Sequence, residues 1–488
     1  MFNTLDWIIV GLYCVGIISL ATYVSRNKSG SERSAEDYFL AGRSLPWWAI
    51  GASLIAANIS AEQIIGMSGQ GFVVGMAIAV WELTAAIALI VMAKYFLPLF
   101  LEKKIYTMPQ FLEQRFDKRV SLVLSFFWLT VYIFVNLTAV LWLGSIAINT
   151  LTGLSLVNGM ILLAALSLAY SLSGGLKAVA MTDIVQVVLL IFGGLAVSYI
   201  ALTKIGNGYI GDGMLEVYQQ MPEKFDMILS PDNPSYNNLP GIWILIGAGV
   251  WIGHFAYWGF NQYITQRALG AKSIKEAQKG VMFAAYLKLL MPLVIVLPGI
   301  CAAVLFPVLE KTDQAYPTMM IELLPSGLLG LTFAALVAAI VSSLASLTNS
   351  VSTIFTMDLY KGNMSMNDKS LVGVGRKAGL VGLIISIIVA PIFLGSLDSA
   401  FQYVQEYMGL FSPVILFVFL SAIVLKNSTS NSVLWGSATA LIAGVIMKLY
   451  VANTSESLIE PFMHQMAISF FLAFVVSGLL SPNKENDK

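Results

Sequence analysis

The chain has 488 residues, of which 58% are hydrophobic and only 11% are charged. A soluble globular protein is about 45–50% apolar and about 25% charged, so the composition excludes that class and indicates a protein that crosses a membrane many times. The 27 basic and 27 acidic residues balance, and no basic cluster resembles a nucleic-acid-binding footprint.

Thirteen apolar stretches along the chain are long enough for membrane helices, since a helix needs about 20 apolar residues to cross the hydrocarbon core. They are 5–24, 46–70, 73–100, 120–148, 155–173, 181–203, 241–264, 280–306, 327–357, 375–395, 401–425, 433–451 and 464–481. The pattern predicts an all-α polytopic membrane protein. The first stretch contains Asp6 and follows no basic segment, so a cleaved signal peptide is not expected.

The loops between these stretches differ strongly in basic residues. Those that follow odd-numbered stretches, with the C-terminal tail, hold 21 Lys and Arg residues when Arg376 and Lys377, at the start of 375–395, are counted with the preceding loop. The other loops hold only Lys204, Lys224 and Lys311. Basic loops stay in the cytoplasm, which predicts an external N-terminus and a cytoplasmic C-terminus. The loop 204–240 is then external, and we expect a short helix in it.

Two stretches carry glycines and polar side chains at the depth of the bilayer centre. One is 51–69, with Asn58 and Glu62, and the other, five stretches later, is 247–262, with His254. Interrupted helices at corresponding places in two halves are typical of inverted-repeat transporters. Close helix packing through small residues is the alternative, but the polar side chains favour a binding site.

Glu82 and Lys288 are charged residues within apolar stretches, where a charge costs at least ~2.5–3.5 kcal/mol. A structural ion pair would explain them, and so would a polar solute site. Carboxylate, ammonium and amide groups beside aromatic rings suit a solute with many hydroxyls, such as a sugar. The candidate set is Asn58, Gln63, Glu82, Tyr257, Trp258, Lys288 and Gln405.

The stretch 338–346 contains the adjacent serines Ser342 and Ser343. Hydroxyls together with carbonyls of unwound backbone form an uncharged oxygen cage that suits Na⁺. Serines in membrane helices also bond back to the carbonyl four residues earlier, so a purely structural role stays open. The cytoplasmic loops are too short for an ATPase, and transport would therefore use an ion gradient.

Five segments of the chain resemble the sodium–solute symporter family, and in particular its bacterial sodium/sugar cotransporters. They are Glu36–Trp48, Gly51–Gly69, Tyr257–Tyr263, Ala338–Ser346 and Ala400–Tyr407. The resemblance implies a five-plus-five inverted-repeat (LeuT-type) core in a bacterial inner membrane. The expected regions are 1–45 (flanking helix and cytoplasmic loop), 46–203 (first repeat), 204–240 (external loop), 241–425 (second repeat) and 426–488 (two flanking helices).

The resemblance also implies roles for individual residues. The sugar would be hydrogen-bonded by Asn58, Gln63, Glu82, Lys288 and Gln405. Tyr257 would stack under the sugar as the inner gate, backed by Trp258, and the outer lid would comprise Met67, Trp81 and Phe401. Na⁺ would be held by the carbonyls of Ala56, Ile59 and Ala339 and by the hydroxyls of Ser342 and Ser343, with Asp183 along its exit path.

Three positions depart from the family pattern. His254 replaces an asparagine, Trp81 a tyrosine and Ala85 a serine. We expect these changes to affect which sugar epimer is favoured, and we expect His254, as a further sugar contact, to make uptake depend on pH.

The expected function is symport of a hexose with Na⁺ as the coupling ion, by alternating access and without enzymatic activity. Another cargo stays open (inositol, sialic acid, an amino acid or an organic acid), as does a sugar sensor or channel on the same fold. Sialic acid would require an arginine in the site, and the predicted stretches contain none apart from Arg376, at the very start of 375–395.

Overall fold

The computed structural model describes the chain except for residues 1, 26–34, 361–367, 398, 455–458 and 482–488. Some basic residues that support the predicted orientation lie outside the described residues, namely Arg26, Lys28, Arg33, Lys361, Lys484 and Lys488. The described part is helical, and its one strand-like pairing is an isolated bridge between Leu45 and Ala271.

The helices up to the external loop include several π-helical and 3₁₀ segments, labelled η. They are α1 (Thr4–Ser25), α2 (Ala35–Leu40), η1 (Ala41–Arg43), α3 (Trp47–Asn58), η2 (Glu62–Met67), α4 (Ser68–Val73), η3 (Met76–Ala79), α5 (Val80–Val91), η4 (Met92–Phe96), α6 (Leu97–Glu102), α7 (Met108–Arg115), α8 (Lys118–Val131), η5 (Tyr132–Leu137), α9 (Thr138–Thr152) and α10 (Leu156–Ile205).

The remaining helices begin in the loop predicted to be external. They are α11 (Ile210–Gln220), η6 (Pro222–Phe225), α12 (Trp243–Ile246), α13 (Gly249–His254), η7 (Phe255–Gly259), α14 (Gln262–Leu269), α15 (Ile274–Lys288), η8 (Pro292–Val296), α16 (Leu297–Leu305), η9 (Thr312–Gln314), α17 (Ala315–Leu323), α18 (Leu328–Ile354), η10 (Phe355–Tyr360), α19 (Asp368–Leu394), α20 (Ala400–Val424), α21 (Ser430–Asn453) and α22 (Phe462–Leu480). The short helix expected within 204–240 is confirmed by α11.

Within the described residues, nine helices are long and apolar enough to cross a membrane, or eleven if each of two bent pairs is one crossing. The bent pairs are Trp47–Asn58 with Glu62–Val73, at 58°, and Ile274–Lys288 with Pro292–Leu305, at 41°. The predicted stretch 155–173 contributes only a short apolar segment to this count, and 241–264 is divided among α12, α13, η7 and α14. The total of thirteen crossings therefore stays a prediction.

The turn expected between stretches 155–173 and 181–203 falls within α10, whose two apolar parts are Leu156–Ala169 and Leu176–Ile205. Leu163 and Ile340 both lie against Gly144, and Asp183 accepts from Ser342. Both parts of α10 therefore reach the same level of α18, which a straight helix with a rise of about 1.5 Å per residue could not do, so the chain turns back between them as predicted.

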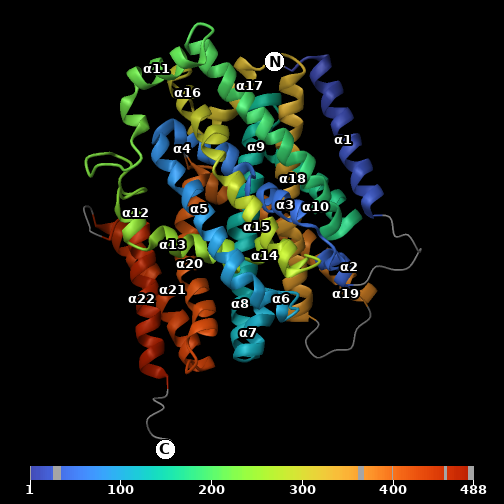
Figure 1. The fold of residues 1–488 in the computed structure, drawn as a ribbon, viewed down its shortest axis with the longest axis vertical. Coiled ribbons are helices and arrows are strands. Elements are labelled where there is room, and N and C mark those ends of the chain that lie inside the picture. Colours follow the sequence, from blue (N-terminus) through green and yellow to red (C-terminus); the bar gives the residue numbers. More distant parts are fainter. Residues whose placement is uncertain (1, 26–34, 361–367, 398, 455–458, 482–488) are drawn as a thin grey trace, which may run out of the picture.

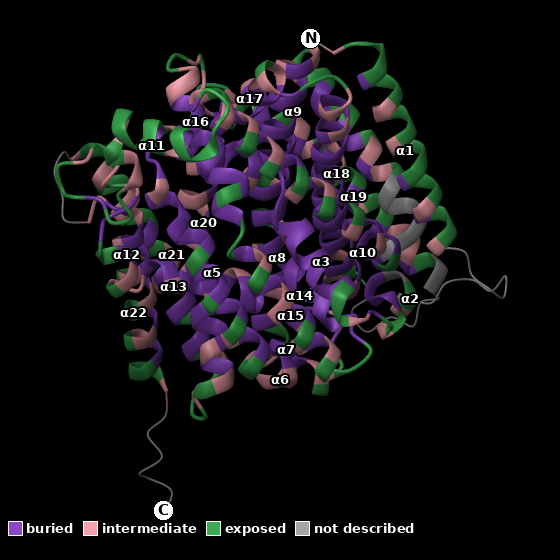
Figure 2. Cartoon of the chain, turned by 45° about the horizontal axis from the view of Figure 1, so that its top comes forward, coloured by how far each residue is buried: buried purple, intermediate pink, exposed green. Residues whose placement is uncertain are grey.

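The helices form a bundle in which α1 lies along one edge and α21 and α22 lie side by side along the other (Figure 1). Between these edges, α10 packs against α3 and α18, and α15 packs against α3 and α5. Figure 2 shows that buried residues are concentrated in these inner helices, whereas α1 is largely exposed. A protein in lipid exposes apolar surface in this way because hydrocarbon, not water, surrounds it.

The two interrupted helices predicted from the sequence are confirmed. In the first, α3 ends at Asn58, Ile59 leaves the helical conformation (φ −76°, ψ 71°), and the chain resumes as the π-helical η2. In the second, η7 ends at Gly259, Phe260 leaves the helical conformation (φ −130°, ψ −2°), and α14 begins with the Asn261 side chain accepting a hydrogen bond from the Tyr263 amide. Both breaks place irregular backbone inside the protein, where side chains can satisfy it.

Candidate functional site

All eight residues expected to bind the solute line a single cavity of about 70 Å³. They come from both broken helices and from α5, α15 and α20: Asn58, Gln63, Glu82, His254, Tyr257, Trp258, Lys288 and Gln405. Two of the three expected lid residues, Met67 and Trp81, also line it. The third, Phe401, lies behind Gly66, where an added Cβ would come within 2.7 Å of the Phe401 Cβ.

Lys288 and Glu82 form a buried ion pair in the cavity wall. The Lys288 Nζ donates to Glu82 Oε2 at 2.6 Å, and the side chains are 1% and 2% exposed. The same ammonium lies 5.3 Å from the centroid of the Trp258 ring, within cation–π range. An ammonium has three donors and a carboxylate several acceptor positions, so the pair retains hydrogen-bonding capacity toward a solute.

His254 hydrogen-bonds a hydroxyl that has two partners. The Thr84 hydroxyl lies 2.5 Å from the Val80 carbonyl and 2.8 Å from His254 Nε2. In the tautomer in which Thr84 donates to the Val80 carbonyl, Nε2 carries the proton that it shares with Thr84, and Nδ1 is the acceptor. The ring also meets the Trp81 edge at a centroid distance of 5.4 Å, so two residues that depart from the family pattern support each other.

Four buried oxygens around the cavity have no hydrogen-bond partner among the described residues. They are Asn58 Oδ1, Glu62 Oε1, Gln63 Oε1 and Asn136 Oδ1. An unsatisfied buried acceptor costs about 1–3 kcal/mol, so the site is poised to accept a ligand with several hydrogen-bond donors.

The sequence analysis missed Asn136 and Ser412 as cavity residues. Glu62 lines the same cavity; the sequence analysis noted it as a polar residue but assigned it no role. An amide in the otherwise apolar stretch 120–148 was the available signal for Asn136. Serine is common in membrane helices, so Ser412 gave none.

Hydrogen-bonded tyrosines lie between the cavity and the break in the second helix. Asn58 Nδ2 donates to the Tyr257 hydroxyl at 3.2 Å, and that hydroxyl hydrogen-bonds the hydroxyl of Tyr263. The Tyr132 hydroxyl donates to Asn261 Oδ1 at 2.6 Å. The expected inner gate Tyr257 is thus connected by hydrogen bonds to both broken helices.

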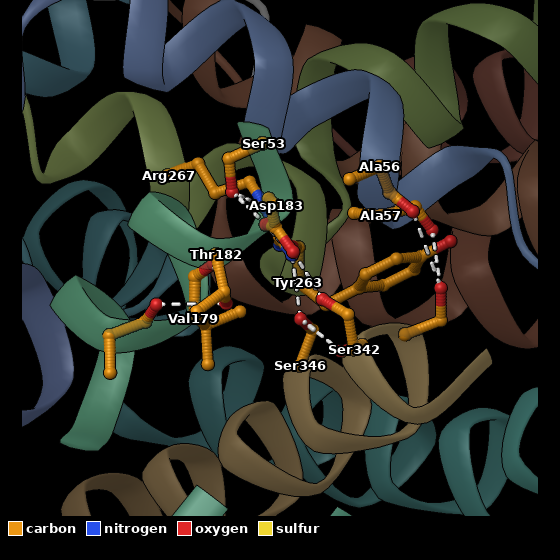
Figure 3. A network of polar contacts seen from close by, with 12 residues as sticks. Ser53, Ala56, Ala57, Val179, Thr182, Asp183, Tyr263, Arg267, Ser342 and Ser346 are labelled. Atoms are coloured by element: carbon orange, nitrogen blue, oxygen red, sulfur yellow. Dashed lines mark hydrogen bonds and ion pairs between the residues drawn. The ribbon is translucent and has the colours of Figure 1, made fainter. Parts of the chain in front are cut away.

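The expected ion site lies where α3 ends against α18. The Ser343 hydroxyl donates toward the carbonyls of Ala57 at 3.3 Å and Ala56 at 3.5 Å. Ile59 and Ala339 are both fully buried. The neighbouring Ser342 hydroxyl, in contrast, hydrogen-bonds Asp183 (Figure 3). Four of the five expected ligands therefore remain uncommitted to a charged partner, whereas Ser342 would have to turn from Asp183 toward the ion.

Asp183 is the centre of a buried polar network in Figure 3. Its two oxygens accept from the hydroxyls of Ser342 and Ser53, and the Arg267 Nη2 lies 3.7 Å away. Arg267 also donates through Nε to Ser53 at 2.7 Å and through Nη2 to Ser346 at 2.6 Å. The network joins α3, α10, α14 and α18 behind the expected ion site.

The sequence analysis placed Arg267 in a cytoplasmic loop, and this is wrong. α14 continues the second broken helix past Arg267, which is only 1% exposed. The guanidinium is tolerated because Asp183 and two serine hydroxyls surround it, and buried charges require such partners. Arg267 is not among the residues that line the solute cavity.

Comparisons with known proteins agree with this geometry. A model of the sodium:solute symporter family matches residues 38–440. The sodium/glucose cotransporter of Vibrio parahaemolyticus is 48% identical over 498 residues, covering 98% of this chain and 90% of its own. The human sodium/myo-inositol cotransporter 2 is 32% identical over 452 residues, covering 85% of this chain and 65% of its own.

The fold is similar to that of a solved Na⁺-coupled sialic acid symporter in a substrate-bound outward-open state. The TM-score is 0.83 at 22% identity, over 99% of this chain and 100% of the other. This likeness confirms the expected inverted-repeat fold. The chain belongs to the sodium:solute symporter family, and it is a multi-pass membrane transporter with Na⁺ as its coupling ion.

Proposed function

We propose that this transporter carries a hexose into the cell together with Na⁺ by alternating access. The observation that carries the proposal is the set of four unpartnered acceptors around the Glu82–Lys288 pair in one cavity. A hexose supplies several hydroxyl donors for these oxygens, and each hydroxyl can also accept from Lys288 or from an amide. The sugar named for the Vibrio relative supports this choice.

Each cavity residue has a part in holding the sugar. Asn58, Gln63, Glu82, Lys288 and Gln405 hydrogen-bond the hydroxyls, and His254 Nδ1 accepts one more. Tyr257 presents its ring to the apolar face of the sugar and closes the inner side, with Trp258 behind it. The lid on the outer side comprises Met67, Trp81 and Phe401.

Na⁺ binds between α3 and α18 and orders the sugar site next to it. The carbonyls of Ala56, Ile59 and Ala339 and the hydroxyls of Ser342 and Ser343 hold the ion, and Asp183 lies on its exit path. Ser343 already lies within 3.5 Å of the α3 carbonyls. An ion there holds α3 against α18 and fixes Asn58, which lies between the ligands Ala56 and Ile59, so that Na⁺ binding prepares the sugar site.

The protein lies in a bacterial inner membrane, with its N-terminus outside and its C-terminus in the cytoplasm. The excess of basic residues in loops that follow odd-numbered helices supports this orientation.

A carboxylated sugar is a weaker candidate. Its carboxylate would need a cationic partner in the cavity, and there Lys288 is already paired with Glu82 at 2.6 Å. Arg267 is directed to Asp183 and the serines instead.

The test is uptake of radiolabelled galactose and glucose into proteoliposomes, with an inward Na⁺ gradient or an equal K⁺ gradient. We expect accumulation above equilibrium with Na⁺ only, and loss of accumulation in Glu82→Ala and Ser343→Ala. Ser437→Ala is the matched control, since the Ser437 hydroxyl only bonds back to Val433 within α21. Sealed vesicles that accumulate myo-inositol but neither hexose would refute hexose as the cargo.

A further inference from the structure

A second polar cavity of about 290 Å³ lies between α20, α21, α22 and the loop that contains Asn237 and Asn238. It shares two lining residues with the central cavity, Gly409 and Phe462. A Cβ added to Gly409 would come within 3.0 Å of the Phe462 ring. These two residues are therefore a thin partition between the two cavities.

The outer cavity repeats the chemistry of the central cavity. Lys448 Nζ lies 3.2 Å from Glu406 Oε2 and 4.1 Å from the centroid of the Tyr407 ring. In the central cavity, Lys288 pairs with Glu82 and lies over Trp258 in the same manner. Each cavity is thus lined by a carboxylate and an ammonium in contact, and each ammonium lies over an aromatic ring. Trp258 lines the central cavity itself, whereas Tyr407 is not among the residues that line the outer cavity.

Amides and a hydroxyl complete the outer set, since Asn238, Gln465 and Ser469 also line the cavity. Gln402, which does not line it, donates through Nε2 to Asn238 Oδ1 at 2.9 Å and to Glu406 Oε1 at 3.0 Å. Ser469, which lines the cavity and is only 2% exposed, has a hydroxyl without a partner among the described residues. A buried hydroxyl directed at an open cavity is satisfied when a ligand hydroxyl enters.

We propose that this outer cavity is a second hexose site, which captures the sugar before it enters the central cavity. The inference rests on the proposed function and on the proposed orientation, in which the loop at Asn238 is extracellular. The Lys448 and Glu406 side chains are 33% and 38% exposed, whereas the central pair is almost fully buried. Water competes more strongly at the outer pair, so the outer site binds the sugar more weakly.

The experiment measures protection of a reporter cysteine by sugar. Ala452, an exposed residue of the outer cavity, is replaced by cysteine in a chain whose Cys14 and Cys301 are changed to serine. The central site is disabled with Glu82→Ala, and the labelling rate with a water-soluble maleimide is measured with and without galactose. Glycine betaine at equal osmolarity is the additive control.

We expect galactose to slow labelling at least threefold, glycine betaine to leave the rate unchanged, and Lys448→Met to abolish protection. Lys94→Met is the matched control, because Lys94 also lies over a neighbouring tyrosine, at 5.1 Å, but lines neither cavity. Ser469→Ala gives a second test that leaves the ion pair intact, and we expect it to weaken protection. Labelling that galactose does not slow, or protection that survives Lys448→Met, would overturn the outer site.

This outcome is separable from that of the proposed function. Protection at Ala452→Cys needs neither Na⁺ nor transport, whereas the proposed function is judged by Na⁺-driven uptake. In a chain with an intact central site, we expect Lys448→Met to raise the galactose KM several-fold with little change in kcat.

Discussion

Glu82 and Lys288 connect α5 to α15 across the solute cavity and do so at 1–2% exposure. A buried ion pair contributes little net stability, because desolvation of both charges offsets their attraction. Its retention here is explained by the solute, which can hydrogen-bond both groups once the cavity is filled. Structural and binding roles can be separated by variants that keep the pair but exchange its ends.

The charge-exchanged variant Glu82→Lys/Lys288→Glu is the first prediction. Lys288→Met alone leaves a buried carboxylate without its partner, which costs about 3–5 kcal/mol of unfolding free energy. The exchanged pair restores most of that stability, but it presents donors where the sugar meets acceptors, so uptake remains at background. Thermal unfolding in detergent and galactose uptake measure the two effects. Wild-type uptake by the exchanged variant would show that the pair is only structural.

The broken helices α3–η2 and α13–η7–α14 are the elements that bring the cavity together. Their polar groups are supplied by different segments: Asn58 and Gln63 come from the first, and His254 and Tyr257 from the second. Glycine allows close approach where the first broken helix meets α20, since the space beside Gly66 is filled by Phe401. The position of η2 is therefore coupled to the expected lid.

Gly66→Ala is the second prediction. The added Cβ would lie 2.7 Å from Phe401 Cβ, so η2 and α20 must move apart. We expect galactose uptake to fall at least fivefold and the protein to lose about 1–3 kcal/mol of unfolding free energy, as overpacked sites do. Gly16→Ala in α1 is the control, since no atom lies within 4 Å of its added Cβ. Equal uptake by the two variants would contradict the coupling.

Asp117 caps the start of α8 outside the membrane-spanning part, accepting from the amides of Arg119 and Val120. Burial alone would raise the pKa of Asp117, but hydrogen bonds from Arg119, Ser430 and the backbone lower that pKa below its ordinary value. A lowered pKa means that the carboxylate stabilises the fold above about pH 4, and that this stability is lost as the pH falls through the folded-state pKa.

The third prediction concerns this cap. We expect Asp117→Ala to lower the unfolding free energy by about 1 kcal/mol at pH 7, the usual effect of losing an N-cap. Asp117→Asn keeps the cap and loses only the charge. The difference in unfolding free energy between this variant and wild type should therefore be small at pH 7 and vanish as the pH approaches 3. Denaturation of the purified protein between pH 7 and pH 3 measures both. If the difference in unfolding free energy between wild type and Asp117→Asn grew toward low pH, the lowered pKa of Asp117 would be contradicted.

At the scale of the whole molecule, the proposed alternating access requires helices around the cavity to move relative to one another. The Asp183–Arg267 network joins α3, α10, α14 and α18, and α20 and α22 border both polar cavities. One Na⁺ per sugar would supply enough energy for uphill transport. A potential of 100 mV contributes ~2.3 kcal/mol per charge, and a tenfold gradient adds ~1.4 kcal/mol.

The fourth prediction follows from these two contributions. With one Na⁺ per sugar, a tenfold Na⁺ gradient and 100 mV drive galactose to an accumulation of several hundred-fold, since ~1.4 kcal/mol is a factor of ten. Collapsing the potential with valinomycin and equal K⁺ should reduce this to about tenfold. The ratio is read at steady state in tight proteoliposomes. About a hundredfold accumulation without a potential would instead indicate two Na⁺ ions.

The sequence by itself determined the class, the family and most of the solute cavity. Composition and the lengths of the apolar stretches leave a helical membrane protein as the solution, because the bilayer requires every backbone group to be bonded within the span. The cavity residues were predictable because polar groups such as Asn58, Glu82 and Lys288 are costly inside a membrane. Each therefore marks a position that needs a partner or a ligand.

Only the tertiary structure decided which polar groups are partners of one another. Arg267 lies beyond a predicted stretch and has the composition of a loop residue, yet α14 places it beside Asp183 in the interior. The outer pair of Glu406 and Lys448 was likewise hidden. Local sequence reports the cost of burying a group, whereas the contacts that offset the cost come from helices distant in the chain.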